Sequence, residues 1–145
     1  MKTLNLKTAE EIELIRESAL IVSKTLGMLA KELKPGVTTL QLDNLAETFI
    51  RDHGAIPGFL GLYDFPNTLC VSPNEQVVHG IPNDTPLKEG DIISIDCGAI
   101  KNDFYGDHAY TFAVGEIAPE TKRRPGPPAP RSPAPAGDKN LHSEI

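Results

Sequence analysis

Two alternating segments, residues 91–99 and 104–115, constrain the fold of this chain most strongly. Polar and apolar side chains alternate along both segments, which is the period of a β-strand with one buried face. Lys101-Asn102-Asp103 separates the segments and favours a tight turn. The sequence therefore predicts an antiparallel hairpin, against which the rest of the domain must pack.

Each predicted strand carries an aspartate, Asp96 on the first and Asp107 on the second. A two-residue turn at 101–102 would place these residues directly opposite each other. A two-residue turn at 102–103 would make them diagonal neighbours on one face of the sheet. A three-residue turn without a bulge would separate them. The sequence leaves these registers open.

Two ionised carboxylates on one face of an isoleucine-rich hairpin require a compensating cation or a shared proton. Aspartate is a poor strand former, and like charges at opposed positions destabilise a strand pair. Carboxylate oxygens suit divalent Mn, Fe, Co or Zn, so one interpretation is a metal site at Asp96 and Asp107. The other interpretation leaves one carboxylate in solvent or bound to backbone amides.

The histidines and Cys70 are the other candidates for chemistry. His79 follows the strand-like segment QVVH (76–79) and precedes Gly-Ile-Pro, so we expect it at a strand end, either as a catalytic or ligand residue or as a structural histidine. His108 alternates to the face opposite Asp107. His53 is expected at a helix end, where a cation interacts favourably with the helix dipole. Cys70 has no partner motif and is expected to be buried.

Two amphipathic helices precede the hairpin. Thr8 and Thr38 each begin a capping box, while Pro35-Gly36 ends the first helix and Gly54 caps the second. The segment TLCV (68–71) is strand-like. The apolar stripes expected to face the core are Ile12, Ile15, Ala19, Val22, Leu26, Leu29 and Leu33, then Leu42, Leu45, Ala46, Phe49 and Ile50.

Composition narrows the class of protein. The 145 residues are 39% hydrophobic and 23% charged, as in a soluble globular domain. Two cysteines argue against a disulfide scaffold, and no apolar run approaches the ~18 residues of a membrane span. The N-terminus becomes polar too early for a secretory signal, and a net charge of -6 argues against nucleic-acid binding. We therefore expect a cytoplasmic protein.

Residues 122–145 differ in composition from the rest of the chain. They contain six of the 13 prolines and five of the 14 lysines and arginines, with no aromatic residue. Such a segment buries too little apolar surface to offset the entropy lost on ordering. We predict a disordered tail after a domain formed by residues 1–121.

Taken in order, these segments resemble the N-terminal half of type I methionine aminopeptidases, of the pita-bread metallopeptidase superfamily. The resemblance covers residues 6–115 and includes FPNTLCVSPNEQVVHGIPND, LKEGDIISIDCGAI and FYGDHAYTFAVG. It implies an α+β fold, with helices on one side of a curved, mainly antiparallel sheet. It also implies metal-assisted hydrolysis of the peptide bond after an initiator methionine.

The resemblance assigns roles to individual residues. Asp96 and Asp107 match the two aspartate ligands of a site for two divalent ions (Co, Mn, Fe or Zn), and Asp107 matches the one that bridges them. His79 matches the catalytic histidine that contacts the scissile peptide. Phe59, Leu62, Phe65 and Cys70 fall in the stretch that shapes the methionine pocket. The implied partners are the N-terminal methionine of nascent polypeptides and the nearby ribosome, with no DNA or membrane and a monomeric state if complete.

The resemblance stops at about Thr121, before the part of the family's domain that supplies a histidine ligand, two glutamate ligands and a second substrate-contacting histidine. We therefore expect a fragment that is inactive alone, with at best a partial metal site. The tail is interpreted as the product of a shifted reading frame or a truncated gene model. The alternative is a non-catalytic half domain that binds a peptide or a partner chain.

Overall fold

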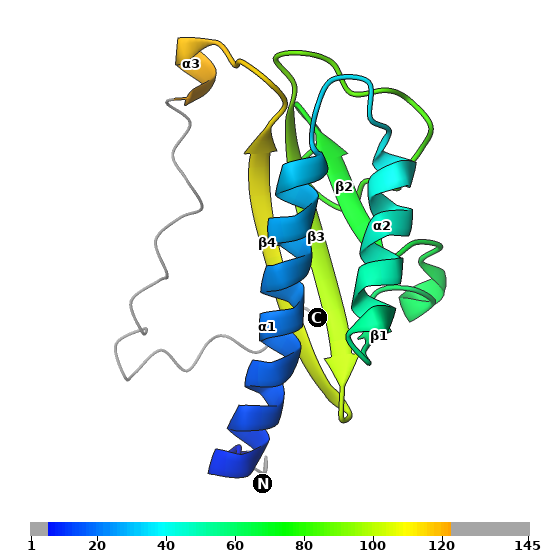
Figure 1. Ribbon diagram of the computed structural model, residues 1–145, viewed down its shortest axis with the longest axis vertical. Helices are drawn as coiled ribbons and strands as arrows, with labels where there is room; N and C mark the ends of the chain where they lie inside the picture. Colours follow the sequence, from blue (N-terminus) through cyan, green and yellow to red (C-terminus); the bar gives the residue numbers. More distant parts are fainter. Residues whose placement is uncertain (1–5, 123–145) are drawn as a thin grey trace, which may run out of the picture.

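The computed structural model describes residues 6–122 (Figure 1). The predicted tail lies outside these residues, apart from Lys122. In chain order the elements are α1 (Ala9–Glu32), α2 (Thr39–Asp52), β1 (Ile56–Pro57), the 3-10 turn η1 (Leu62–Asp64), β2 (Leu69–Pro73), β3 (Ile92–Lys101), β4 (Phe104–Ala113) and α3 (Pro119–Lys122).

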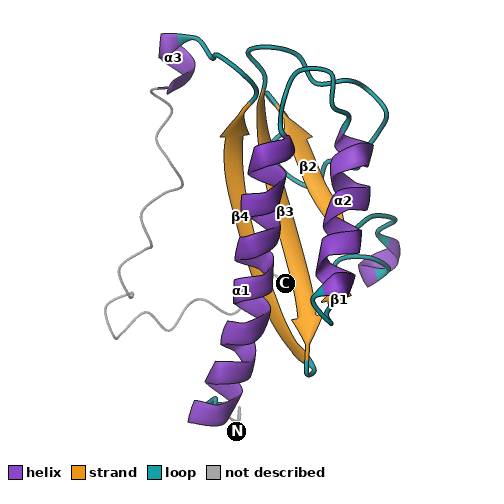
Figure 2. Cartoon of the chain, in the orientation of Figure 1, coloured by secondary structure: helices purple, strands orange, loops and turns teal. Residues whose placement is uncertain are grey.

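The sheet is antiparallel throughout, and β3 lies at its centre. The strands β1 and β2 pair with β3 along one edge, and β4 pairs with the other edge. Both long helices lie against the same face of this sheet, with α1 over β3 and β4 and α2 beside β2 (Figures 1 and 2). The predicted α+β class is confirmed.

Helix α1 begins at the predicted capping box, in which the Thr8 hydroxyl accepts from the Glu11 amide at 3.2 Å. Its buried face is Ser18, Ile21, Val22, Thr25, Leu26 and Leu29. The prediction that Ile12 and Ala19 face the core is wrong, since both are exposed. The first turns of α1 extend past the end of the hairpin (Figure 1), and the turn residue Asn102 donates a hydrogen bond to Glu17.

Helix α2 also has its predicted capping box, and it ends at His53, with Gly54 following at φ 70°. Leu42, Ala46 and Ile50 are fully buried. Leu45, predicted to face the core, is 41% exposed because it turns away from the sheet. The helices pack on apolar side chains from the sheet, namely Leu69, Val71, Ile93, Ile95, Cys97 and Ala99.

The predicted strand at 76–79 is wrong. This segment is an irregular loop, in which Val77 is 82% exposed and Val78 is 61% exposed. The chain reverses after β2 through a turn in which the Gln76 amide donates to the Pro73 carbonyl at 3.0 Å. A strand requires a continuous backbone partner, and the returning chain meets β2 at Gly80, which accepts from the Val71 amide.

The hairpin turn is formed by Asn102 and Asp103, both with positive φ, as two-residue hairpin turns require. Lys101 therefore pairs with Phe104, which corresponds to the second of the predicted registers. Helix α1 holds this turn through buried Ser18, whose hydroxyl accepts from the Lys101 amide and donates to the Phe104 carbonyl at 2.7 Å.

Within residues 6–122, no helix combines the length and the apolar character needed to cross a membrane.

Candidate metal centre

Asp96 and Asp107 lie on the sheet face that points away from α1 and α2. The neighbouring positions Ile95 and Cys97 are fully buried in the core beneath the helices, so the alternation of β3 directs Asp96 to the other face. Asp107 pairs with Gly98, two residues from Asp96. The two carboxylates are therefore diagonal neighbours on one face.

The pair is electrostatically strained without a cation. Burial raises the pKa of Asp96 to about 6, and the charge and hydrogen bond of Asp107 act in the same direction. The Cys97 amide and His79 oppose this shift in pKa. The buried Asp96 Oδ1 has no hydrogen-bond partner among the described residues. A buried carboxylate oxygen without a partner is costly, so this position favours a bound proton or cation.

The carboxylate oxygens of Asp96 and Asp107 suit a hard divalent ion, but two carboxylates are few ligands for a metal site. Carboxylate oxygens are the donors that such ions prefer. Within residues 6–122, no group of three or more histidine, cysteine, aspartate or glutamate side chains is arranged to hold a metal. Asp96 and Asp107 have the donor chemistry of two metal ligands, and their role in a partial metal site stays a prediction.

His79 is exposed and lies in the loop after β2, at φ 58°, rather than at a strand end as predicted. The following residue fixes its position. The Gly80 amide donates to the Ser72 hydroxyl at 3.1 Å, and a Cβ on Gly80 would collide with the Val71 carbonyl. Only glycine allows this close approach of the backbone to β2. The charge of the neighbouring His79 lowers the pKa of Asp96.

Phe59 and Cys70 border Asp96 on the same face. A Cβ on Gly98 would lie 2.6 Å from Phe59 Cε1, so the Phe59 ring covers Gly98. Cys70 pairs directly with Asp96 across β2 and β3 and is 7% exposed. Burial, followed by the charges of Asp96 and Asp107, raises the pKa of the Cys70 thiol to about 11. Cys70 is therefore an uncharged side chain at neutral pH, and its predicted burial is confirmed.

The other sequence candidates lie elsewhere. Leu62 is 43% exposed at the start of η1, and Phe65 is half-buried at its end. Their role in a methionine pocket remains a prediction. His108 pairs with Cys97 on the helix side of the sheet, and His53 lies at the end of α2, both as predicted. The C-cap itself is His53 rather than Gly54, which follows it.

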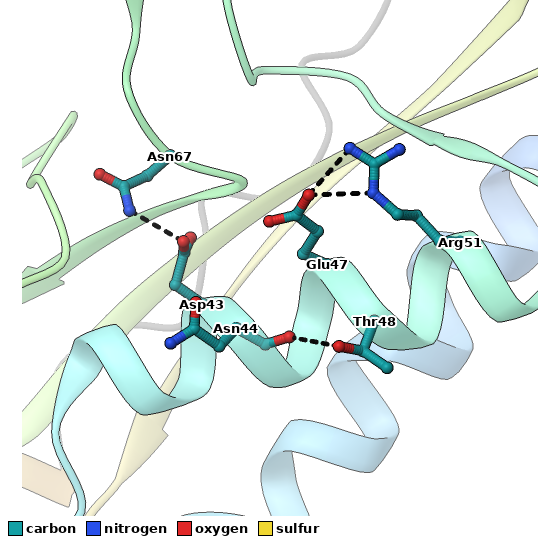
Figure 3. A network of polar contacts seen from close by, with 6 residues as sticks. All are labelled: Asp43, Asn44, Glu47, Thr48, Arg51 and Asn67. Carbon is teal, nitrogen blue, oxygen red and sulfur yellow. Dashed lines mark hydrogen bonds and ion pairs between the residues drawn. The ribbon is translucent and has the colours of Figure 1, made fainter.

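Sequence reasoning missed Asp43, a 3% exposed acid on α2. It accepts hydrogen bonds from the Asn67 side chain (Figure 3) and from the Leu69 amide. Leu69 begins β2, so Asp43 contacts the strand that carries Cys70. A signal was present: at 3.6 residues per turn, Asp43 lies beside the stripe formed by Leu42, Ala46 and Ile50.

The sequence and the fold of this chain are similar to those of known proteins. A methionine aminopeptidase from Clostridium acetobutylicum is 54% identical over 119 residues, which are 81% of this chain and 48% of the relative. One from Clostridium perfringens is 50% identical over 118 residues, or 47% of its length. The crystal structure of methionine aminopeptidase from Rickettsia prowazekii superposes with a TM-score of 0.82 at 39% identity, covering 83% of this chain and 49% of that one.

The chain thus spans about half the length of the curated relatives that it matches. The family model for metallopeptidase family M24 matches residues 13–124, which contain most of the first helix, all of the second, the sheet and both aspartates. This chain belongs to metallopeptidase family M24.

Proposed function

We propose that this chain provides one part of a methionine aminopeptidase, which removes the initiator methionine from nascent proteins. The observation that carries the proposal is the diagonal pair Asp96 and Asp107, with a partnerless buried oxygen, on the hairpin of an M24 domain. Bound divalent ions supply Lewis acidity to a peptide carbonyl. The candidate ions are Co, Mn, Fe and Zn.

The residues around the pair have separate roles in this proposal. Asp96 and Asp107 bind the metal ions. His79, exposed on its loop, contacts the scissile peptide and orients it by hydrogen bonding. Phe59 and Cys70 form an apolar wall beside Asp96, which suits a methionine side chain. Leu62 and Phe65 complete that pocket.

In this proposal the chain has no aminopeptidase activity on its own. Two carboxylates supply fewer ligands than metal sites in proteins normally use, and residues 6–122 offer no third ligand in reach. The remaining ligands therefore come from outside these residues. The rest of the proposal follows the family: action in the cytoplasm near the ribosome, as a monomer when complete, without DNA or membrane partners.

A second candidate function is a half domain that binds a peptide N-terminus or a partner chain without hydrolysis. The same lack of a three-ligand cluster within residues 6–122 favours it. The exposed loop valines Val77 and Val78, close to His79 in the chain, would then contact the bound chain.

The test compares two proteins: the 145-residue chain, and residues 1–121 joined to the remaining half of the Clostridium acetobutylicum relative. We expect the joined protein to release methionine from Met-Ala-Ser with Mn²⁺ or Co²⁺, and the chain alone to release none. Asp96→Asn should abolish release. Asp103→Asn is the matched control, because Asp103 lies in the turn of the same hairpin and asparagine tolerates its positive φ.

The outcomes separate the candidates. Release by the 145-residue chain alone would refute its proposed inactivity. A joined protein that folds and binds metal but releases no methionine would refute the aminopeptidase proposal. Metal-independent binding of Met-Ala-Ser by the chain alone, without turnover, would favour the binding function.

A further inference from the structure

We infer that Asp43 is a positioning residue, which orders the start of β2 and thereby holds Cys70 in place beside Asp96. The inference extends the proposed function, because the contact of Cys70 with substrate belongs to that proposal. The ordering of β2 itself does not depend on it.

The Asp43 carboxylate uses both of its oxygens on one short segment. Its Oδ1 accepts from the Leu69 amide at 2.7 Å, and its Oδ2 accepts from the Asn67 side-chain amide at 2.8 Å (Figure 3). A single side chain of α2 thus anchors Asn67 and Leu69, on either side of Thr68, just before Cys70.

Burial of the Asp43 carboxylate carries a desolvation cost. Asp43 is 3% exposed, and among the described residues no lysine, arginine or histidine forms an ion pair with it. Burial raises the pKa of Asp43, while the hydrogen bonds from Asn67 and Leu69 oppose the shift. An apolar side chain would fill the same space without this desolvation cost. What the carboxylate adds is the set of hydrogen bonds to residues 67–69.

These hydrogen bonds act at the point where strand pairing begins. Leu69 pairs with Cys97, and Cys70 pairs with Asp96, whereas Asn67 precedes β2 and has no strand partner. Without Asp43, the first pairs of β2 would fray, as unpaired strand ends do. Fraying would move Cys70, which is one residue from the Leu69 amide, before it moved Ser72.

The experiment uses the full chain and four variants. Asp43→Asn keeps the shape but removes the charge and replaces one acceptor oxygen with a donor, so Asn67 must turn its amide over to keep a hydrogen bond to position 43. The double variant, Asp43→Asn with Asn67→Asp, exchanges the two side chains and restores complementarity. The amide now on α2 accepts from Leu69 through its oxygen and donates to the carboxylate now at position 67.

Two further variants complete the set. Glu47→Gln is the matched control for loss of an α2 carboxylate. Glu47 lies one turn along α2, half-buried beside Arg51, and its charge raises the pKa of Asp43, but among the described residues its carboxylate hydrogen-bonds only to Arg51 (Figure 3). Asn67→Ala removes one hydrogen bond to Asp43 and leaves the Leu69 bond intact.

The readouts are amide hydrogen exchange at Leu69 and alkylation of Cys70 by iodoacetamide, with buried Cys97 as the internal reference. We expect Asp43→Asn to accelerate both by about tenfold or more, since hydrogen bonds to charged groups are among the stronger ones. Asn67→Ala should show a smaller increase. The double variant should return both rates to within about twofold of the original, and Glu47→Gln should leave them unchanged.

Two results would overturn the inference: unchanged rates at Leu69 and Cys70 in Asp43→Asn, or equal acceleration at Cys97, which would indicate global destabilisation. If Asp43→Asn does not fold, the double variant decides. Its folding with original rates supports the inference, and its failure to fold contradicts it. No readout involves metal or peptide, so failure of the proposed function would leave these results unaffected.

Discussion

Asp96 and Asp107 lie diagonally across the β3–β4 hairpin, because Asp107 pairs with Gly98 and Asp96 pairs with Ala109. Their direct cross-strand partners, Gly98 and Ala109, carry only a hydrogen and a methyl group as side chains. Neither of these two small side chains separates the carboxylates. Burial, together with their repulsion, is what raises the pKa of Asp96 to about 6.

The first prediction concerns Asp96→Asn in the 145-residue chain. We expect Mn²⁺ to bind more weakly. Loss of an outer-shell partner lowers metal affinity by about 10–100-fold, and loss of a direct ligand should lower it by more. We also expect higher stability of the metal-free protein at neutral pH, because the change removes a like-charge repulsion. Calorimetric titration and urea unfolding measure the two effects. Unchanged metal binding would show that Asp96 is not a ligand.

The second prediction concerns two pH dependences of opposite sign. As the pH rises, the stability of the metal-free chain should fall and its affinity for metal should increase. The pKa of Asp96 is about 6 in the folded chain, above the ordinary value of about 3.9. The folded state therefore holds this proton more tightly than the unfolded state. Its stabilising contribution is complete below about pH 4 and is lost as the pH rises through about 6.

Metal affinity should change the other way, because a metal binds the ionised carboxylate. We expect Mn²⁺ binding to strengthen from about pH 5 to about pH 7 and then to level off. Urea unfolding of the metal-free chain and calorimetry across this range test both signs. Asp96→Asn should weaken the stability trend, and the part that persists comes from other carboxyls with a raised pKa, such as buried Asp43. An undiminished trend in this variant would contradict the assignment to Asp96.

The third prediction contrasts two glycine-to-alanine substitutions. A Cβ on Gly106 would collide with the α1 backbone at Ser18 and Ala19, which cannot move cheaply. Gly106→Ala should lower the free energy of unfolding by about 2–3 kcal/mol or more. Gly27→Ala, within α1 and with open space around it, should raise it by about 0.5–1 kcal/mol. Thermal unfolding distinguishes the signs, and stabilisation by Gly106→Ala would contradict the packing described.

The fourth prediction concerns Ser18, which is fully buried and joins α1 to both ends of the hairpin turn. Ser18→Ala leaves the Lys101 amide and the Phe104 carbonyl without this partner. We expect a loss of about 1–3 kcal/mol in the free energy of unfolding. Ser23→Ala, at an exposed position of the same helix, is the control and should change stability little. Equal effects of the two substitutions would contradict the prediction.

The local elements could be predicted because neighbouring residues specify them. Both capping boxes, the two helices and the alternation of β3 and β4 depend on spacings within a few residues. The shared face of Asp96 and Asp107 was one of the arrangements that the sequence left open, and the two-residue turn at Asn102 and Asp103 decided it. The strand at 76–79 was wrong because a strand also needs a partner at the right distance, which local sequence does not show.

The sequence by itself determined the capped helices and the alternation of the two hairpin strands, because these follow from periodicity along the chain. Only the tertiary structure decided the diagonal register, the partnerless oxygen of Asp96 and the burial of Asp43 against β2. Each of these depends on which of several locally acceptable pairings packs best against α1 and α2. That choice is made by contacts between residues far apart in the sequence.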